Sequence, residues 1–187
     1  MKILAKQSEK RAYVANGTEI MRMKFAKARK FLNPLNYILQ MGFAPQRLRK
    51  GKTAIGRAMS AVLQSAMVGE YPHIEVDPAR VKISAGVTAI LPVCSVERIG
   101  ATIRIRWVAL GAQLRGAERD DRIILCAYAV QEELAAINEE EVLRAEGDLQ
   151  MQLPEGMEHM PVHLYLCVHD RDKINFSNSQ YLGRFIS

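Results

Sequence analysis

The segment Thr102–Leu110, with the sequence TIRIRWVAL, constrains the fold of this chain more than any other stretch. Its apolar residues Ile103, Ile105 and Trp107 alternate with arginines, and Trp107 is the only tryptophan of the chain. Alternation with a period of two residues is typical of a β-strand that is buried on one face only. The segment therefore predicts a sheet that has one face against a core and the other face in solvent.

Further stretches of strand character follow it. Residues 122–130 are almost entirely apolar, which indicates a central strand, whereas the acidic residues 132–141 are expected to form a helical turn or a loop. In Pro161–Asp170 the alternation predicts that Val162, Leu164, Leu166 and Val168 face inward. His163, Tyr165, Cys167 and His169 then face outward, with the two histidines in solvent. Short strands separated by turns, without a regular alternation of strand and helix, favour an antiparallel β-sandwich. The segments of strand character expected after the tryptophan segment cover residues 122–130, 142–153, 161–170 and 176–186.

Two kinds of sandwich fit this pattern. In an immunoglobulin-like arrangement, Cys94, Trp107 and Tyr165-x-Cys167 stand near the spacing of the disulfide, core tryptophan and tyrosine corner. In a fibronectin-type-III-like arrangement, Trp107 ends the second strand and no disulfide is needed. We favour the second arrangement because it accounts for more of the residues.

The first part of the chain has the period of helices instead. Met21, Phe25, Ala28 and Leu32 form one apolar stripe. A second short helix is expected from Pro34 to Met41, and a third from a cap at Thr53 to Val68. The prediction is an α+β chain with two parts: residues 1–70 form a basic helical region with a mobile N-terminal arm, and residues 71–187 form the β-sandwich domain.

Four segments stand in the order known from one family: RMKFAKARKFLNPL, GEYPHIEVDPARVKISAG, RIRWVAL and LYLCVHDRDKINFSNSQYLG. The chain resembles, from about residue 20 to its C-terminus, an uncharacterised Bacteroidetes family that is classified as a domain of unknown function. The resemblance implies N-terminal helices followed by a β-sandwich. It implies no activity and no catalytic residues.

The charge is distributed unevenly. Residues 1–60 contain 14 lysines and arginines against two acids, whereas residues 61–187 contain 12 against 18. A basic segment on an acidic body indicates a polyanionic partner or a charge match within an assembly. The residues that would bind nucleic acid are Arg22, Lys24, Lys27, Arg29, Lys30, Arg47, Arg49, Lys50, Lys52 and Arg57.

Catalytic and cofactor motifs are missing from the sequence. Gly51-Lys52-Thr53 resembles the end of a phosphate-binding loop, but Gln46 stands where the first glycine belongs, so a helix cap is predicted. The sequence shows neither a nucleophile beside a base nor cysteines in metal-binding pairs. We therefore expect a protein that is not an enzyme and that has no cofactor and no metal site.

The expected location is the cytoplasm, since MKILAKQSEKR lacks the apolar core of a secretory signal and no stretch is long enough to span a membrane. The expected function is a non-enzymatic interaction or structural module that can self-assemble through its helices or a sheet edge. The alternative is sequence-independent nucleic-acid binding through the basic helical region. Phosphate binding predicts that the basic side chains converge, unpaired, on one face. Assembly predicts that they are scattered or paired with acids such as Glu132 and Glu133.

Overall fold

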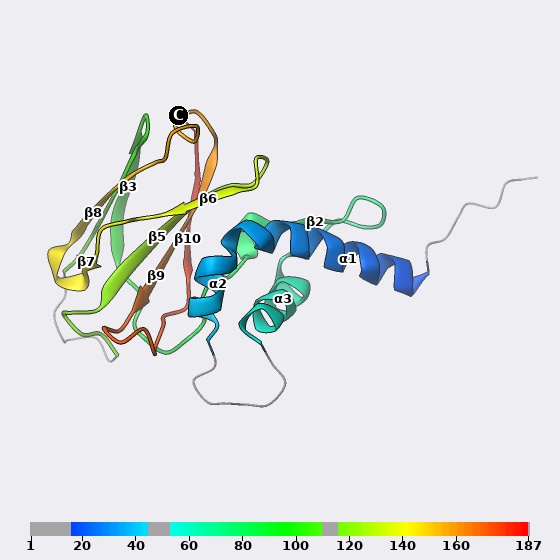
Figure 1. Cartoon of the computed structure of the whole chain (residues 1–187), viewed down its shortest axis with the longest axis horizontal. Helices are drawn as coiled ribbons and strands as arrows, with labels where there is room; N and C mark the ends of the chain where they lie inside the picture. The colour runs from blue at the N-terminus through cyan, green and yellow to red at the C-terminus, as the bar shows by residue number, and fades with distance from the viewer. Residues whose placement is uncertain (1–15, 45–52, 110–115, 187) are drawn as a thin grey trace, which may run out of the picture.

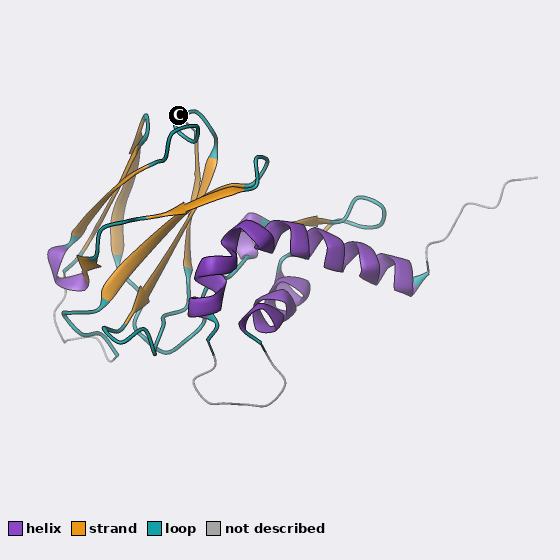
Figure 2. Ribbon diagram, viewed as in Figure 1, coloured by secondary structure: helices purple, strands orange, loops and turns teal. Residues whose placement is uncertain are grey.

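The computed structural model describes residues 16–44, 53–109 and 116–186. These residues form an α+β fold in three layers, as the sequence predicts: a small sheet, a larger sheet, and helices on the outer face of the larger sheet (Figures 1 and 2). The helical elements are α1 (Gly17–Leu32), the 3-10 turn η1 (Asn33–Leu35), α2 (Asn36–Gly42) and α3 (Ala54–Ser65). A short hairpin of β1 (Met67–Val68) and β2 (Glu75–Val76) and the turn η2 (Pro78–Arg80) follow them.

All strands of the sandwich pair antiparallel. One sheet has the order β3-β4-β8, and the other has the order β10-β9-β5-β6, with β7 also paired to β5. The strands of the first sheet are β3 (Val93–Ile99), β4 (Thr102–Trp107) and β8 (Asp148–Gln152). Those of the second are β5 (Arg122–Ala129), β6 (Leu134–Ile137), β7 (Val142–Leu143), β9 (Val162–His169) and β10 (Gln180–Phe185), and the turn η3 (Arg144–Glu146) follows β7.

Two helices begin at side-chain caps. The Asn16 side chain accepts a hydrogen bond from the Glu19 backbone N–H at 2.9 Å, and the Glu19 carboxylate accepts one from the Asn16 N–H at 3.3 Å, which makes a capping box. The Thr53 hydroxyl oxygen accepts a hydrogen bond from the Gly56 N–H at 3.0 Å. The predicted cap at Thr53 is confirmed.

The first core lies between the two sheets. Ile103, Ile105 and Trp107 of β4 are at most 5% exposed and face it, as their alternation predicts. From the larger sheet, the inward side chains of β9 are those predicted: Val162, Leu164, Leu166 and Val168.

The second core lies between the outer face of the larger sheet and the helices. Ala28, Leu39 and Val62 of the three helices share an apolar cluster with Tyr128 of β5 and Tyr165 of β9. Tyr165 and Cys167 are buried beneath the helices, and His169, predicted to face solvent, is buried on the same sheet face, so that prediction is wrong for His169. The alternation of β9 marks the two faces of the strand correctly, but the helices cover the second face. The division into residues 1–70 and 71–187 stays a prediction, and both ranges contribute to this cluster.

Two strands escape the sequence pattern. β3 lies at a sheet edge, and its residues alternate only weakly between half-buried and exposed. β6 falls in residues 132–141, which were predicted as a helical turn or loop. Two glutamates, Glu132 and Glu133, occupy the turn before it, and β6 itself is a short edge strand. The acidic turn residues are therefore the reason why the sequence pattern does not indicate β6.

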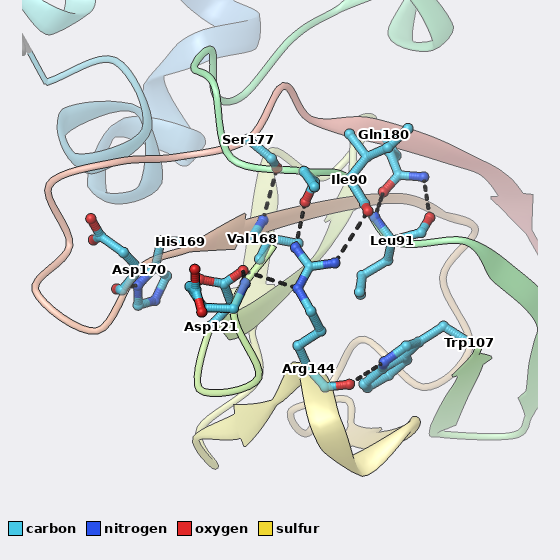
Figure 3. A network of polar contacts seen from close by, with 12 residues as sticks. Ile90, Leu91, Trp107, Asp121, Arg144, Val168, His169, Asp170, Ser177 and Gln180 are labelled. Atoms are coloured by element: carbon cyan, nitrogen blue, oxygen red, sulfur yellow. Dashed lines mark hydrogen bonds and ion pairs between the residues drawn. The ribbon is translucent and has the colours of Figure 1, made fainter. Parts of the chain in front are cut away.

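The segment before β3 is fastened to the segment before β10. The Ser84 hydroxyl donates to the Ser177 carbonyl at 2.8 Å, and the Val168 N–H donates to the Ser177 hydroxyl oxygen at 3.0 Å. The Gln180 amide forms a hydrogen bond with both the N–H and the carbonyl of Leu91, each at 2.9 Å (Figure 3). A side chain at Gly86 would overlap the Phe176 carbonyl oxygen, so the close approach of these two segments requires glycine there.

A buried ion pair closes one end of the sandwich (Figure 3). The Arg144 Nε lies 3.0 Å from the Asp121 carboxylate, and both side chains are at most 3% exposed. The remaining guanidinium nitrogens of Arg144 donate to the Ala89 and Ile90 carbonyls, while its own carbonyl accepts from the Trp107 indole N–H at 2.8 Å. One arginine thus joins β4, β5, η3 and the loop before β3.

Another arginine closes the opposite end, beyond the start of β4. Arg98 of β3 donates to the Met160 and Phe185 carbonyls at 2.7 and 3.0 Å and to the Glu158 carbonyl at 2.7 Å. These carbonyls belong to the loop before β9 and to the end of β10. The guanidinium therefore joins the edge strand of the small sheet to the larger sheet.

Replacement of Asp121 by Ala should cost about 3–5 kcal/mol of unfolding free energy, because it leaves the buried Arg144 guanidinium without a counter-charge. Urea unfolding followed by the fluorescence of the single tryptophan measures the change. Asp148→Ala is the matched control: its pair with Arg104 is more than two-fifths exposed on both sides, so solvent and salt screen it and stability should change little. Equal losses in both variants would contradict the structural role assigned to the buried pair.

Candidate interaction surface on helix α1

The structure describes six of the ten basic residues that the sequence singles out. Arg22, Lys24, Lys27, Arg29 and Lys30 lie on α1, and Arg57 lies on α3. Arg47, Arg49, Lys50 and Lys52 lie outside the described residues. The nucleic-acid role of the full set therefore stays a prediction.

The cations of α1 point to different sides of the helix. Arg22 and Arg29 are seven residues apart and share one side, whereas Lys27 is turned by about 140° from Arg22, at about 100° per residue. Lys30 pairs with Glu133 of the β5–β6 turn at 3.0 Å. Among the described residues, none of the other four cations of α1 has a carboxylate in ion-pair contact.

The apolar stripe of α1 divides into a buried half and an exposed half. Ala28 and Leu32 are at most 3% exposed and belong to the core beneath the helices. Met21 and Phe25, which continue the same stripe toward the N-terminus, are 45% and 48% exposed. In Figure 1 the beginning of α1 extends away from the sandwich, so the helix outruns the elements that cover its second half.

Positive charges flank the exposed half of the stripe. At about 100° per residue, Arg22 and Arg29 lie to one side of Met21 and Phe25, and Lys24 lies to the other. We call these five residues the α1 strip. It combines accessible apolar area with three cations that have no carboxylate partner in the described part of the chain. The stripe can be recognised in the sequence, but the sequence does not reveal that only half of it is covered.

The histidines of β9 lie in hydrogen-bonded, partly or fully buried positions. The described residues contain no group of three or more metal-binding side chains. His169 is 3% exposed, and its Nδ1 donates to the Asp170 carbonyl at 2.6 Å. Burial lowers its pKa, and the positive charges of Lys173 and Arg122 lower it further. Burial also lowers the pKa of His163, whose Nδ1 lies 2.8 Å from the Tyr181 hydroxyl.

The cysteines are free thiols. Cys126 and Cys167 are completely enclosed by the second core, and burial raises the pKa of Cys167 to about 12. The fraction of reactive thiolate at neutral pH is therefore negligible. Cys94 is exposed on β3, so the disulfide of the immunoglobulin-like alternative is not formed.

The glutamates around β6 lie at the surface, and two of them form ion pairs. Glu133 is bound to Lys30, and Glu141 is bound to Arg122 at 2.7 Å. Glu132, Glu139 and Glu140 are exposed.

Fold and surface together define an α+β protein with an accessible basic and apolar helix face, and no described helix is long and apolar enough to cross a membrane. The chain belongs to a family of unknown function, DUF6266, whose model matches residues 3–183. This agrees with the resemblance found in the sequence. No curated protein and no solved structure matches the chain.

Acidification should weaken the fold through His169. Its folded pKa is below the unfolded value of about 6.5, so the unfolded chain binds more protons as the pH falls below that value. Stability is therefore complete above about pH 6.5 and is lost progressively below it. Urea unfolding between about pH 7.5 and pH 5.5 measures the slope, and His169→Asn, which cannot titrate, should make the slope smaller. A slope that His169→Asn leaves unchanged would contradict this assignment. The slope that remains in this variant should include the contribution of His163, whose pKa is also lowered.

Proposed function

We propose that this protein is a non-enzymatic interaction module and that the α1 strip is its contact surface. The observation that carries the proposal is the exposure of Met21 and Phe25 on a stripe whose other half is core. These two side chains therefore do not serve the core as Ala28 and Leu32 do. Apolar residues left accessible beside cations are typical of a surface that a partner covers.

The finer features expected from the sequence belong to the same proposal. A fibronectin-type-III-like sandwich is supported by the fourth strand, β6, which pairs with the third strand, β5. In immunoglobulin constant domains the fourth strand joins the sheet of the first, second and fifth strands instead. A cytoplasmic location is supported by three free thiols. The Bacteroidetes origin rests on the resemblance alone.

Self-assembly through the strip has a direct test. Light scattering over a range of protein concentrations should show larger species for the unchanged chain and a monomer for Met21→Glu/Phe25→Glu, because two carboxylates cannot be buried in an apolar contact. Ile174→Glu is the control, since Ile174 is 60% exposed in the turn before β10, away from α1. A monomer at every concentration would exclude self-assembly and leave partners of another kind.

Nucleic-acid binding is the second candidate, and Arg22, Lys24, Lys27 and Arg29 favour it because each lacks a carboxylate partner among the described residues. Labelled DNA and RNA should then bind at low salt and dissociate steeply as salt rises. Replacement of Arg47, Arg49, Lys50 and Lys52 by Ala should abolish the binding if the predicted set acts together. No binding at low salt would exclude this candidate.

A further inference from the structure

The α1 strip has the chemistry of a helix that lies at a membrane surface. Such helices place apolar side chains at the boundary of headgroups and acyl chains and place Lys or Arg at the level of the phosphates. Met21 and Phe25 supply the first element, and Arg22, Arg29 and Lys24 supply the second. We propose that the α1 strip binds the surface of an anionic lipid bilayer.

The geometry of the strip favours a flat partner. Met21 and Phe25 are four residues apart, so their side chains lie one above the other along the helix. The cations stand on both sides of this line, and long arginine and lysine side chains can reach the phosphates while their stems lie along apolar surface. A plane that touches the first turns of the helix along Met21 and Phe25, and tilts away from the elements that cover Ala28 and Leu32, is therefore within reach of the cations on both flanks.

Charge complementarity points to an anionic surface. Of the charged residues in α1, Glu19 is the only acid, and it lies in the capping box at the start of the helix. The cations of the strip have no described carboxylate that would neutralise them. Each cation near an anionic membrane contributes to binding, and apolar insertion adds a second signal, so the two together suffice for reversible attachment.

The apolar centre of the strip argues against nucleic acid as its occupant. A duplex would place hydrated phosphates against Met21 and Phe25, whereas a bilayer places acyl chains there. This inference rests on the proposed function, because it names the partner of the same surface.

Flotation of the full chain with lipid vesicles tests the proposal. The chain should float with phosphatidylcholine vesicles that contain phosphatidylserine, should not float with phosphatidylcholine alone, and should be released by high salt. Arg22→Gln/Arg29→Gln should weaken binding about 30-fold through the loss of two cations. The matched control is Arg119→Gln/Arg171→Gln, which removes two exposed cations from loops of the sandwich and should leave binding unchanged.

The apolar part has its own variant. Met21→Glu/Phe25→Glu should abolish flotation, whereas Ile99→Glu, at a 77% exposed position at the end of β3, should not. The four positions replaced in α1, residues 21, 22, 25 and 29, are all exposed, so the thermal unfolding temperature of these variants should be unchanged. Measuring that temperature shows separately whether a variant has lost its fold.

Three results would overturn the proposal. The first is no flotation with the anionic vesicles at low salt. The second is flotation that Met21→Glu/Phe25→Glu leaves intact. The third is binding to DNA that displaces the vesicles and that this variant does not weaken. If vesicles fail while light scattering shows association that the same variant abolishes, the lipid inference is wrong and the proposed interaction module stands. If both assays are negative, both proposals fail.

Discussion

The fold depends on the pairing of β5 with β9. Seven consecutive pairs, from Arg122↔His169 to Tyr128↔His163, join the two strands, and every residue of β5 after Arg122 is buried. Leu125 faces the core between the sheets, while Cys126 faces the core beneath the helices. Two apolar layers are thus built on one backbone ladder. The sheet contributes to the sandwich and to the helical layer at once, so neither layer can shift without the other.

Polar contacts determine how the edges of this arrangement are closed. Arg144 and Arg98 lie at opposite ends of β4 and bind carbonyls from loops and from the end of β10. A guanidinium has five donors in a fixed plane, which suits it to gather carbonyls that converge from several segments. The sandwich therefore has no need of the disulfide that holds many domains of similar shape. Its ends are held by hydrogen bonds that a change of redox state does not affect.

The alternating segments were readable from the sequence because their pattern depends on neighbouring residues alone. β4, β5 and β9 were predicted, and so were the cap at Thr53 and the apolar stripe of α1. What failed required knowledge of contacts between distant segments. His169 was placed in solvent because nothing in β9 reveals that helices lie above it, and β6 was hidden by acids that occupy its turn. The candidate surface was missed for the same reason, since Met21 and Phe25 have the same spacing as the buried part of their stripe.

The capping box at Asn16 and Glu19 stabilises the end of α1 that has the fewest contacts with the core. The second half of α1 is ordered by the core, but the first two turns have few buried side chains to stabilise them. Local hydrogen bonds at the cap must therefore decide how far the helix persists, and this end can open without the unfolding of the body. A partner that binds only the helical state would use part of its binding free energy to order the first turns of α1. The affinity of this surface would then be adjustable at residue 16, away from any residue that touches the occupant.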